Sequence, residues 1–249
     1  GNIDVLSHRI SNVRTWSYVS NKKNWVENSD YWVQLTKDIE DKLSDKLHEE
    51  LTRSFIDKKV SILIFASGNG SNAENLITYF KKKHIEINWI VATNNSEAGV
   101  IERCVKLNVP YFVISKDELN KNSLLEKIKM INPSLIILAG FLLKIPEQII
   151  DYFPQKIVNI HPSLLPKYGG KGMYGMNVHK KIIENKELKS GISIHYVNKY
   201  YDEGEIITQK TIEITYPTNA LNLSKEIQKL EMKYFPVTIE KLLNNVNNG

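Results

Sequence analysis

From residue 60 onwards, short apolar runs alternate with segments of helical periodicity, and this pattern limits the possible folds more than any other feature of the sequence. We expect helices over 72–82, 97–107 and 123–131. The apolar runs around them predict strands over 60–66, 88–93, 111–114, 135–139 and 156–160. Strands that are apolar throughout and are joined by helices indicate a parallel sheet covered on both faces.

The last part of the chain follows a different pattern. Two further strands are expected over 191–198 and 205–214, joined by a turn that contains Asp202, and a final helix is expected over 220–243. Two strands joined so closely pair as an antiparallel hairpin. The sequence therefore predicts an α/β fold with a doubly wound, mostly parallel sheet, a late β-hairpin addition and a C-terminal helix.

The composition changes near residue 59. All eight prolines and eleven of the twelve glycines follow this point, whereas three of the four tryptophans precede it. Within 34–56, apolar residues recur every four positions among charged ones, which predicts a helix. We therefore predict two domains, a helical N-terminal extension over 1–59 and a main domain over 60–249.

Charge and cysteine content narrow the functional class. The net charge of +5 comes entirely from 60–249, because 1–59 holds ten basic and ten acidic residues. Such a modest excess suits small anionic ligands and does not require nucleic acid. The single cysteine, Cys104, excludes an internal disulfide, and we expect it on a helix packed against the sheet. With no signal peptide or membrane-spanning run, we expect a cytoplasmic protein.

Asn159 and His161 are the first candidate functional residues. They alternate at the end of an apolar run that Pro162 terminates, so both side chains should lie on one face at the carboxyl end of a strand. Ligands of open α/β sheets bind at this end. If Asp202 reaches the same crevice, the three form a general acid–base group with an amide donor for an oxyanion. The alternative is a structural histidine and an ordinary turn aspartate.

The loop over 67–72, Ser-Gly-Asn-Gly-Ser-Asn, lies between the first strand and its helix. Glycines allow close approach of a ligand, and the free N–H groups of a helix N-terminus bind anions. The motif is not Gly-x-Gly-x-x-Gly, and Asn94 and Asn95 stand where a dinucleotide site has an acidic residue. We predict a site for one phosphate group; the alternative is a helix N-cap at Ser71 or Asn72.

Other candidates are less specific. His195 either supports the site or is an ordinary sheet residue, and we expect His179 to face outward from its helix. We see no pair with metal-ligand spacing and predict no metal site. The glycine-rich segment 167–176 is interpreted as a mobile lid.

These motifs, together with Leu-Ala-Gly-Phe over 138–141 and Asn-Ile-His-Pro-Ser-Leu-Leu-Pro over 159–166, resemble the folate-dependent formyltransferase superfamily. Within it, 60–249 is most similar to the phosphoribosylglycinamide formyltransferases. The resemblance implies an enzyme of purine biosynthesis that transfers the formyl group of 10-formyltetrahydrofolate to the amine of glycinamide ribonucleotide. The implied reaction is direct attack through a tetrahedral oxyanion, without a metal.

The resemblance also implies residue roles. Asn159 would hold the oxyanion, His161 would carry the proton, and Asp202 would orient the imidazole. The residues implied for the ribonucleotide phosphate and sugar are Gly70, Ser71, Asn72 and Glu231. Those implied for the folate are Asn159, Leu142, Leu143, Lys144, Ile145 and Lys121. The arginine that commonly touches the folate tail in this family has no counterpart here, and we assign Lys121 in its place. The family often has a basic residue at the position of Leu143, and Lys144 is adjacent to it.

Two alternatives remain within the superfamily. A formyltetrahydrofolate deformylase, with water as acceptor, typically carries His-His-Ser after Asn-Ile and a regulatory domain in front, whereas Pro162 follows His161 here. A methionyl-tRNA formyltransferase would need a C-terminal RNA-binding domain, for which we see no sequence.

A third alternative concerns 1–55, which resemble a C-terminal segment of bacterial degradosome-type RNA helicases, although the chain has no phosphate-binding loop for ATP. This alternative is an RNA-associated binding protein. We expect small-molecule substrates, no membrane and no nucleic acid, with 1–59 as a candidate protein contact.

Overall fold

The computed structural model describes residues 3–22, 25–56, 60–119 and 122–247. Contacts divide the chain into two compact units, Gly1–Lys59 and Val60–Gly249. The division falls where the composition of the sequence changes. Each unit is described by itself.

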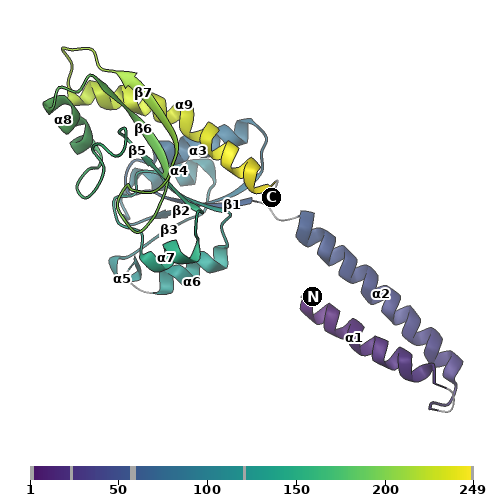
Figure 1. Ribbon diagram of the computed structural model, residues 1–249. Coiled ribbons are helices and arrows are strands. Elements are labelled where there is room, and N and C mark those ends of the chain that lie inside the picture. Colours follow the sequence, from purple (N-terminus) through teal and green to yellow (C-terminus); the bar gives the residue numbers. More distant parts are fainter. Residues whose placement is uncertain (1–2, 23–24, 57–59, 120–121, 248–249) are drawn as a thin grey trace. The chain divides into compact units, whose positions relative to one another are not determined.

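The first unit is a hairpin of two helices, α1 (Ile3–Ser20) and α2 (Ser29–Ile56) (Figure 1). The turn between them is held by Ser29, whose Oγ donates to the Ser20 carbonyl at 2.7 Å. The helix predicted over 34–56 is confirmed but begins five residues earlier. Within the helical extension the bounds of α1 could not be predicted, because its aromatic residues obscure the helical period.

The second unit is built on a seven-stranded sheet in the order β3-β2-β1-β4-β5-β6-β7. The first five strands are parallel, and β6 and β7 continue the sheet as antiparallel strands. The strands are β1 (Val60–Phe65), β2 (Ile87–Thr93), β3 (Tyr111–Val113), β4 (Leu135–Leu138), β5 (Ile157–His161), β6 (Lys189–Tyr196) and β7 (Ile206–Glu213).

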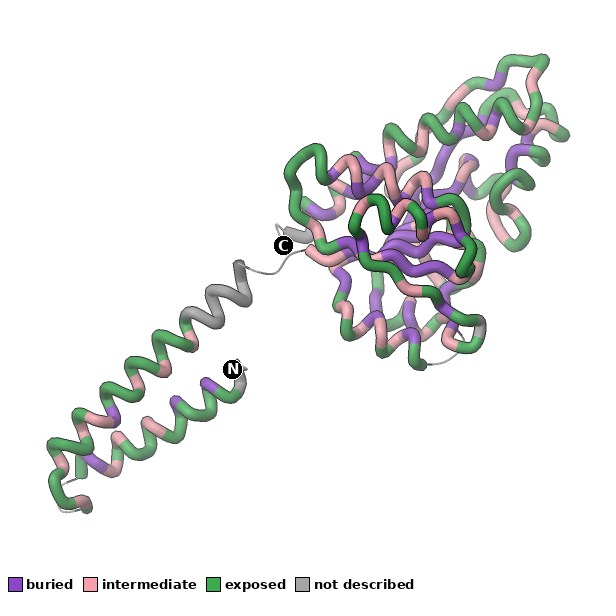
Figure 2. The backbone as a smooth tube through the Cα atoms, turned by 180° about the vertical axis from the view of Figure 1, so that it is seen from behind, coloured by how far each residue is buried: buried purple, intermediate pink, exposed green. Residues whose placement is uncertain are grey.

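Helices cover both faces of the sheet, as the buried core of this unit shows in Figure 2. One face carries α3 (Ser71–Lys82), α4 (Gly99–Leu107), α8 (Met176–Glu184) and α9 (Ala220–Asn247). The other carries α5 (Lys116–Leu119), α6 (Asn122–Ile131) and α7 (Glu147–Tyr152). Along β1, Ile62 and Ile64 pack on the first face, whereas Leu63 and Phe65 pack on the second. The two-residue period of a strand explains why these runs are apolar at every position.

The order of the strands determines where a ligand binds. The chain passes from β1 to β2 and β3 on one side and then returns to place β4 on the other side of β1. The loops that follow β1 and β4 therefore diverge, which leaves a crevice at the carboxyl ends of these strands.

The predicted fold is confirmed, with every predicted strand found within two residues of its expected ends. The short helices α5 and α7 were not predicted, because four- and six-residue helices show no clear period. Cys104 is buried on α4, as expected. Among the described helices, none is long and apolar enough to cross a membrane.

Candidate active site

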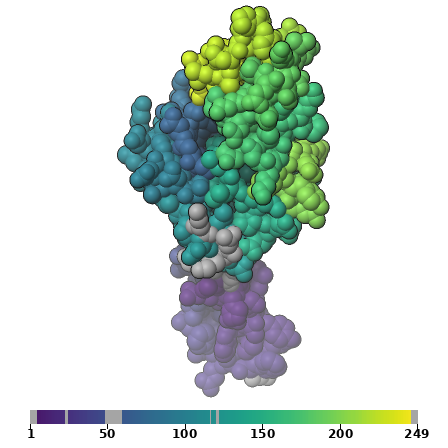
Figure 3. Space-filling view, turned by 90° about the vertical axis from the view of Figure 1, so that its left-hand side faces the viewer, coloured from purple at the N-terminus to yellow at the C-terminus, as the bar shows by residue number. Residues whose placement is uncertain are grey.

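A cavity of about 760 Å³ lies at the carboxyl ends of β1, β4 and β5. Figure 3 shows this side of the second unit, where a hollow separates blue segments near α3 from green segments that follow β5. Most of the candidate residues line the cavity: Asn72, Leu142, Leu143, Lys144, Ile145, Asn159, His161, Asp202 and Glu231. The structure thus brings together residues separated by up to 159 positions in the chain.

The end of β5 positions Asn159 and His161, and β6 adds a third polar residue. Because β5 and β6 are antiparallel, Asn159 lies opposite His195, and His161 lies opposite Ser193. The Asn159 Nδ2 donates to His195 Nε2 at 3.2 Å and to Asp202 Oδ1 at 3.3 Å. The His195 Nδ1 lies 2.8 Å from the Tyr196 carbonyl, which can only accept, so His195 carries its proton on Nδ1 and accepts at Nε2. His195 therefore orients the amide of Asn159.

The imidazole of His161 is buried and held from both sides. Its Nε2 lies 2.8 Å from the Tyr168 carbonyl, so Nε2 is the donor and Nδ1 is the free position of the neutral ring. Nδ1 faces Asp202 Oδ2 at 3.5 Å. Burial lowers the pKa of His161 below its usual value, although the charge of Asp202 opposes this change. His161 is thus a neutral base at pH 7 whose protonated form has a carboxylate partner.

Asp202 is fixed by the backbone. Its own φ is 56°, in the left-handed region, and its Oδ2 accepts from the Gly170 N–H at 2.9 Å. Burial raises the pKa of Asp202, but the neighbouring rings of His195 and His161 and the Gly170 N–H together outweigh it, and the pKa is lowered. Asp202 is therefore ionised next to His161.

The start of α3 forms the other end of the cavity. Gly70 has φ +70°, and a Cβ there would clash with the Val100 side chain, so this position requires glycine. Asn69 and Asn72 line the cavity, with Gly70 and Ser71 between them in the chain. The Asn72 Nδ2 donates to Glu231 Oε2 at 2.9 Å, while the buried Asn72 Oδ1 has no partner. The free N–H groups of the first turn of α3 suit an anion.

Glu231, on α9, is the carboxylate at this end. Burial raises its pKa to about 7, and the hydrogen bond from Asn72 only partly opposes this shift. Near neutral pH the group therefore exists in both forms and can donate or accept a hydrogen bond to a hydroxyl ligand.

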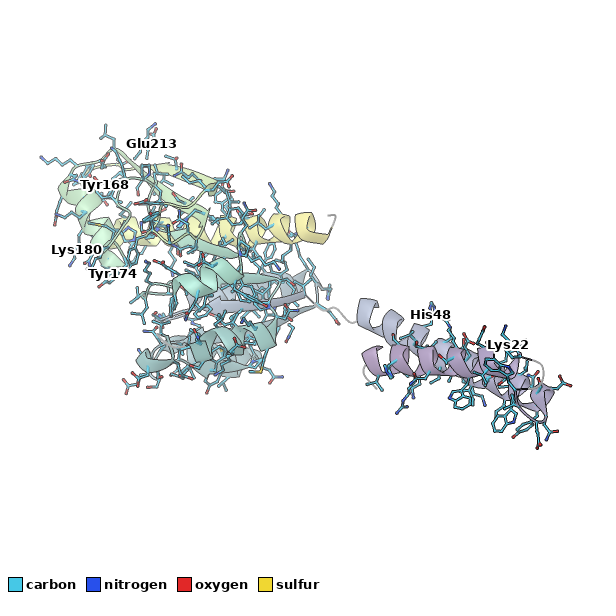
Figure 4. All side chains as sticks on the ribbon, turned by 60° about the horizontal axis from the view of Figure 1, so that its bottom comes forward. Lys22, His48, Tyr168, Tyr174, Lys180 and Glu213 are labelled. Carbon is cyan, nitrogen blue, oxygen red and sulfur yellow. The ribbon has the colours of Figure 1, made fainter. Side chains whose placement is uncertain are left out.

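The segment Leu142–Ile145, after β4, provides an apolar wall. Lys144 pairs with Glu147 at 3.3 Å, and its Nζ lies 6.0 Å from the ring centre of Tyr201. Residues 170–176 also line the cavity. Figure 4 shows Tyr174 of this segment, and Tyr168 just before it in the chain, at one end of the unit. The predicted motion of the loop stays a prediction, and Lys121 lies outside the described residues.

The expectation for His179 was wrong. Instead of facing outward, the side chain is buried, lines the cavity, and has its pKa lowered to about 4 by burial and by His161. The sequence contained a signal for this position, because Val178 and Ile182 mark the inner face of α8 and His179 is adjacent to Val178. Within the described ranges, no group of three or more His, Cys, Asp or Glu side chains is arranged to hold a metal ion.

Comparison with known proteins identifies the family. A model of the formyl transferase family matches residues 60–239, which is almost the whole second unit. The chain belongs to the formyl transferase family. The match leaves out the helical hairpin.

Relatives of this formyl transferase family member share its second unit. A phosphoribosylglycinamide formyltransferase from Bacillus subtilis is 34% identical over 196 residues, 75% of this chain and 96% of that protein. The chloroplastic phosphoribosylglycinamide formyltransferase from Arabidopsis thaliana is 32% identical over 72% of this chain, which spans 63% of that relative's length.

Solved structures of the family have the same fold. Phosphoribosylglycinamide formyltransferase from Anaplasma phagocytophilum matches with a TM-score of 0.68 and 28% identity, over 76% of this chain and 89% of that one. Glycinamide ribonucleotide transformylase 1 from Geobacillus kaustophilus also gives a TM-score of 0.68 at 28% identity, over 74% and 99% of the two chains. The predicted formyltransferase fold is therefore confirmed.

Proposed function

We propose that this protein transfers the formyl group of 10-formyltetrahydrofolate to the amine of glycinamide ribonucleotide, a step of purine biosynthesis. The observation that carries the proposal is the meeting of Asn159, His161 and Asp202 in the same cavity as the start of α3. The named activity of the Bacillus and Arabidopsis relatives supports it.

The cavity suits both substrates. The apolar wall Leu142–Ile145 fits the flat pterin ring of the folate, and the formyl donor supplies an activated one-carbon group next to Asn159. At the other end, the N–H groups at the start of α3 fit a phosphate. Glu231 fits the sugar hydroxyls, because its pKa of about 7 allows it to donate or accept.

His161 acts as the base that receives the proton of the attacking amine. Nε2 already carries a proton, which it donates to the Tyr168 carbonyl. The proton of the amine therefore goes to Nδ1, the atom that faces Asp202. The imidazolium that results lies beside an ionised carboxylate, which stabilises it at the moment when it forms. The same proton then passes to the leaving folate nitrogen, and the imidazole returns to its neutral state.

Asn159 stabilises the negative charge that develops on the formyl oxygen. Its two N–H bonds, at 3.2 and 3.3 Å, are long for N–H···O and N–H···N contacts. Exchange of one of them for an oxyanion therefore gives a shorter and stronger hydrogen bond. One such donor contributes about 3 kcal/mol to transition-state stabilisation.

The test measures formation of the deformylated folate with and without glycinamide ribonucleotide. We expect product only when the ribonucleotide is present. Product in its absence would mean that water is the acceptor, which is the deformylase reaction. No product in either reaction would contradict both activities.

Variants test the roles of the residues. We expect Asn159→Ala to lower kcat about 100- to 1,000-fold, since the loss of one oxyanion donor has this effect, while the melting temperature stays near that of the wild type. His161→Ala should lower kcat at least as much. A kcat near the wild-type value in either variant would remove that residue from the proposed mechanism.

A further inference from the structure

Two of the three proposed catalytic side chains are held by backbone groups of one short stretch, residues 168–170. The Tyr168 carbonyl accepts a hydrogen bond from His161 Nε2 at 2.8 Å. Two residues later, the Gly170 N–H donates to Asp202 Oδ2 at 2.9 Å. The stretch belongs to the loop that follows β5 and is neither helix nor strand. Its position therefore determines how the imidazole and the carboxylate stand relative to each other.

The backbone of this stretch has an unusual conformation. Tyr168 has a φ of 58° and Gly170 a φ of 93°. Glycine adopts positive φ values freely, whereas a residue with a bulky side chain rarely does. A conformation of this kind persists only where the surrounding structure holds the residue in it. The contacts of the Tyr168 side chain show what holds it.

The hydroxyl group of Tyr168 is held at the turn between α8 and β6 (Figure 4). It donates to Glu187 Oε1 at 2.9 Å and accepts from Asn185 Nδ2 at 2.8 Å. The carboxylate of Glu187 is itself paired with Lys167 Nζ at 3.0 Å. The ring of Tyr168 packs against the apolar core on the face of the sheet that α8 covers. The side chain is therefore fixed both along its ring and at its hydroxyl group.

The peptide group in front of Tyr168 is fixed as well. Ser163 is buried, and its Oγ donates to the Lys167 carbonyl at 2.7 Å. The Ser163 carbonyl accepts in turn from Ser193 Oγ at 2.7 Å, and Ser193 lies opposite His161 in the pairing of β5 and β6. The loop is thus tied to the sheet at its start and, through Tyr168, to the turn after α8.

We propose that Tyr168 is a positioning residue, whose hydrogen-bonded hydroxyl group holds the backbone of 168–170 against His161 and Asp202. It acts through these two side chains, because the described lining of the cavity does not include it. The inference rests on the proposed formyl transfer, since it assigns Tyr168 to the same reaction. A base that is held in place needs no rearrangement when the amine attacks.

The main test is Tyr168→Phe, which keeps the ring and removes both hydrogen bonds of the hydroxyl group. Long-range proton–nitrogen NMR spectra of the full chain, labelled with nitrogen-15 histidine and free of substrates, distinguish the two tautomers of a neutral imidazole. The His161 signal is the one that disappears in His161→Gln. Near neutral pH we expect a single tautomer of His161, with the proton on Nε2, in the wild type and a mixture in Tyr168→Phe.

The kinetic effect should appear in the chemical step. We expect Tyr168→Phe to lower kcat about tenfold and to change both KM values by no more than about twofold, because a small displacement of the base affects reaction more than binding. Glu187→Ala removes the acceptor of the Tyr168 hydroxyl and should have the same effect. Glu187→Gln keeps an acceptor oxygen and should have a kcat close to that of the wild type.

Tyr216→Phe is the matched control. It removes the hydroxyl group of another tyrosine that contacts Glu187, where it donates to the backbone carbonyl at 3.1 Å. This contact does not involve Tyr168, so we expect neither the His161 signal nor kcat to change. Circular dichroism at 222 nm shows whether each variant keeps its helices.

A mixed His161 tautomer together with a lower kcat in Tyr168→Phe, and neither change in Tyr216→Phe, supports the proposal. An unchanged His161 signal overturns it even if kcat falls, as does an unchanged kcat or an equal effect in the control. A wild type without formyl transfer contradicts the proposed function instead. The NMR comparison then still decides whether Tyr168 holds His161, because it needs no substrate.

Discussion

The position of one proton on His161 connects the structure to the chemistry. The Tyr168 carbonyl fixes the tautomer, so the basic nitrogen is the one that faces Asp202. Burial and the carboxylate act in opposite directions on the pKa of His161, and burial has the larger effect. The proposed reaction needs the neutral imidazole, so activity should fall as the pH drops through this pKa.

The variant Asp202→Asn separates these two influences. Removing the carboxylate removes the cause that raises the pKa of His161, so the acid limb of the kcat/KM profile should move to lower pH. The plateau should fall about 100-fold, because the imidazolium loses its partner. The measurement is kcat/KM from pH 5 to 8. An acid limb that stays in place or moves upward would show that Asp202 does not act on His161 in this way.

His179 should make folding sensitive to acid. The usual histidine pKa of 6.5 applies to the unfolded chain, while the folded pKa is about 4, so the unfolded chain binds more protons between these values. The stabilisation that neutral His179 contributes is therefore fully present above pH 6.5 and is lost as the pH falls towards 4. In His179→Asn this loss should be less steep by up to about 1.4 kcal/mol per pH unit.

Urea unfolding at several pH values between 4.5 and 7 measures this difference. His84→Asn is the matched control, because His84 is exposed and asparagine tolerates its φ of 57°. The same slope in His179→Asn and in the wild type would contradict the prediction.

At the scale of elements, the turn from β1 into α3 should be sensitive to substitution. Gly70→Ala would place a Cβ against Val100 and force alanine to a φ of +70°. We expect a loss of about 2 kcal/mol or more in the free energy of unfolding, together with a higher KM for the ribonucleotide, because the start of α3 must shift.

Gly68→Ala provides the control for this prediction. Gly68 lies in the same loop, but a Cβ there has no neighbour within 4 Å. The two variants are compared by thermal unfolding and by KM. An equal effect of both would mean that loss of flexibility, rather than the contact with Val100, determines the result.

Sequence reasoning located the elements well where two independent signals agreed. Three signals placed the side chains of Asn159 and His161 at the end of β5. They are the apolar run before Asn159, the end of the strand that Pro162 requires, and the two-residue period of a strand.

Sequence reasoning gave no bounds for α1, because scattered aromatic residues hide the helical period. It misplaced His179, because a histidine beside an apolar stripe can face inward or outward. His195 lies opposite Asn159 because of the register in which β5 and β6 pair. This register cannot be predicted from the local sequence of either strand.

At the scale of the whole molecule, the single thiol reports on the folding of the second unit. Cys104 is buried on α4, and burial raises its pKa, so it should react slowly with Ellman's reagent in the native protein. One thiol per chain should react rapidly in 6 M guanidinium chloride. Rapid labelling of the native protein would contradict the packing of α4 on the sheet.

The bond between Asn72 and Glu231 has a consequence for the order of events during synthesis. The two residues are 159 positions apart, on the first helix of the second unit and on its last. Domains begin to fold while the ribosome is still extending the chain. The nascent protein can build its sheet early, but it lacks the carboxylate at this end of the cavity until α9 has been translated. A ribosome that stalls before α9 would therefore release a chain without this part of the site.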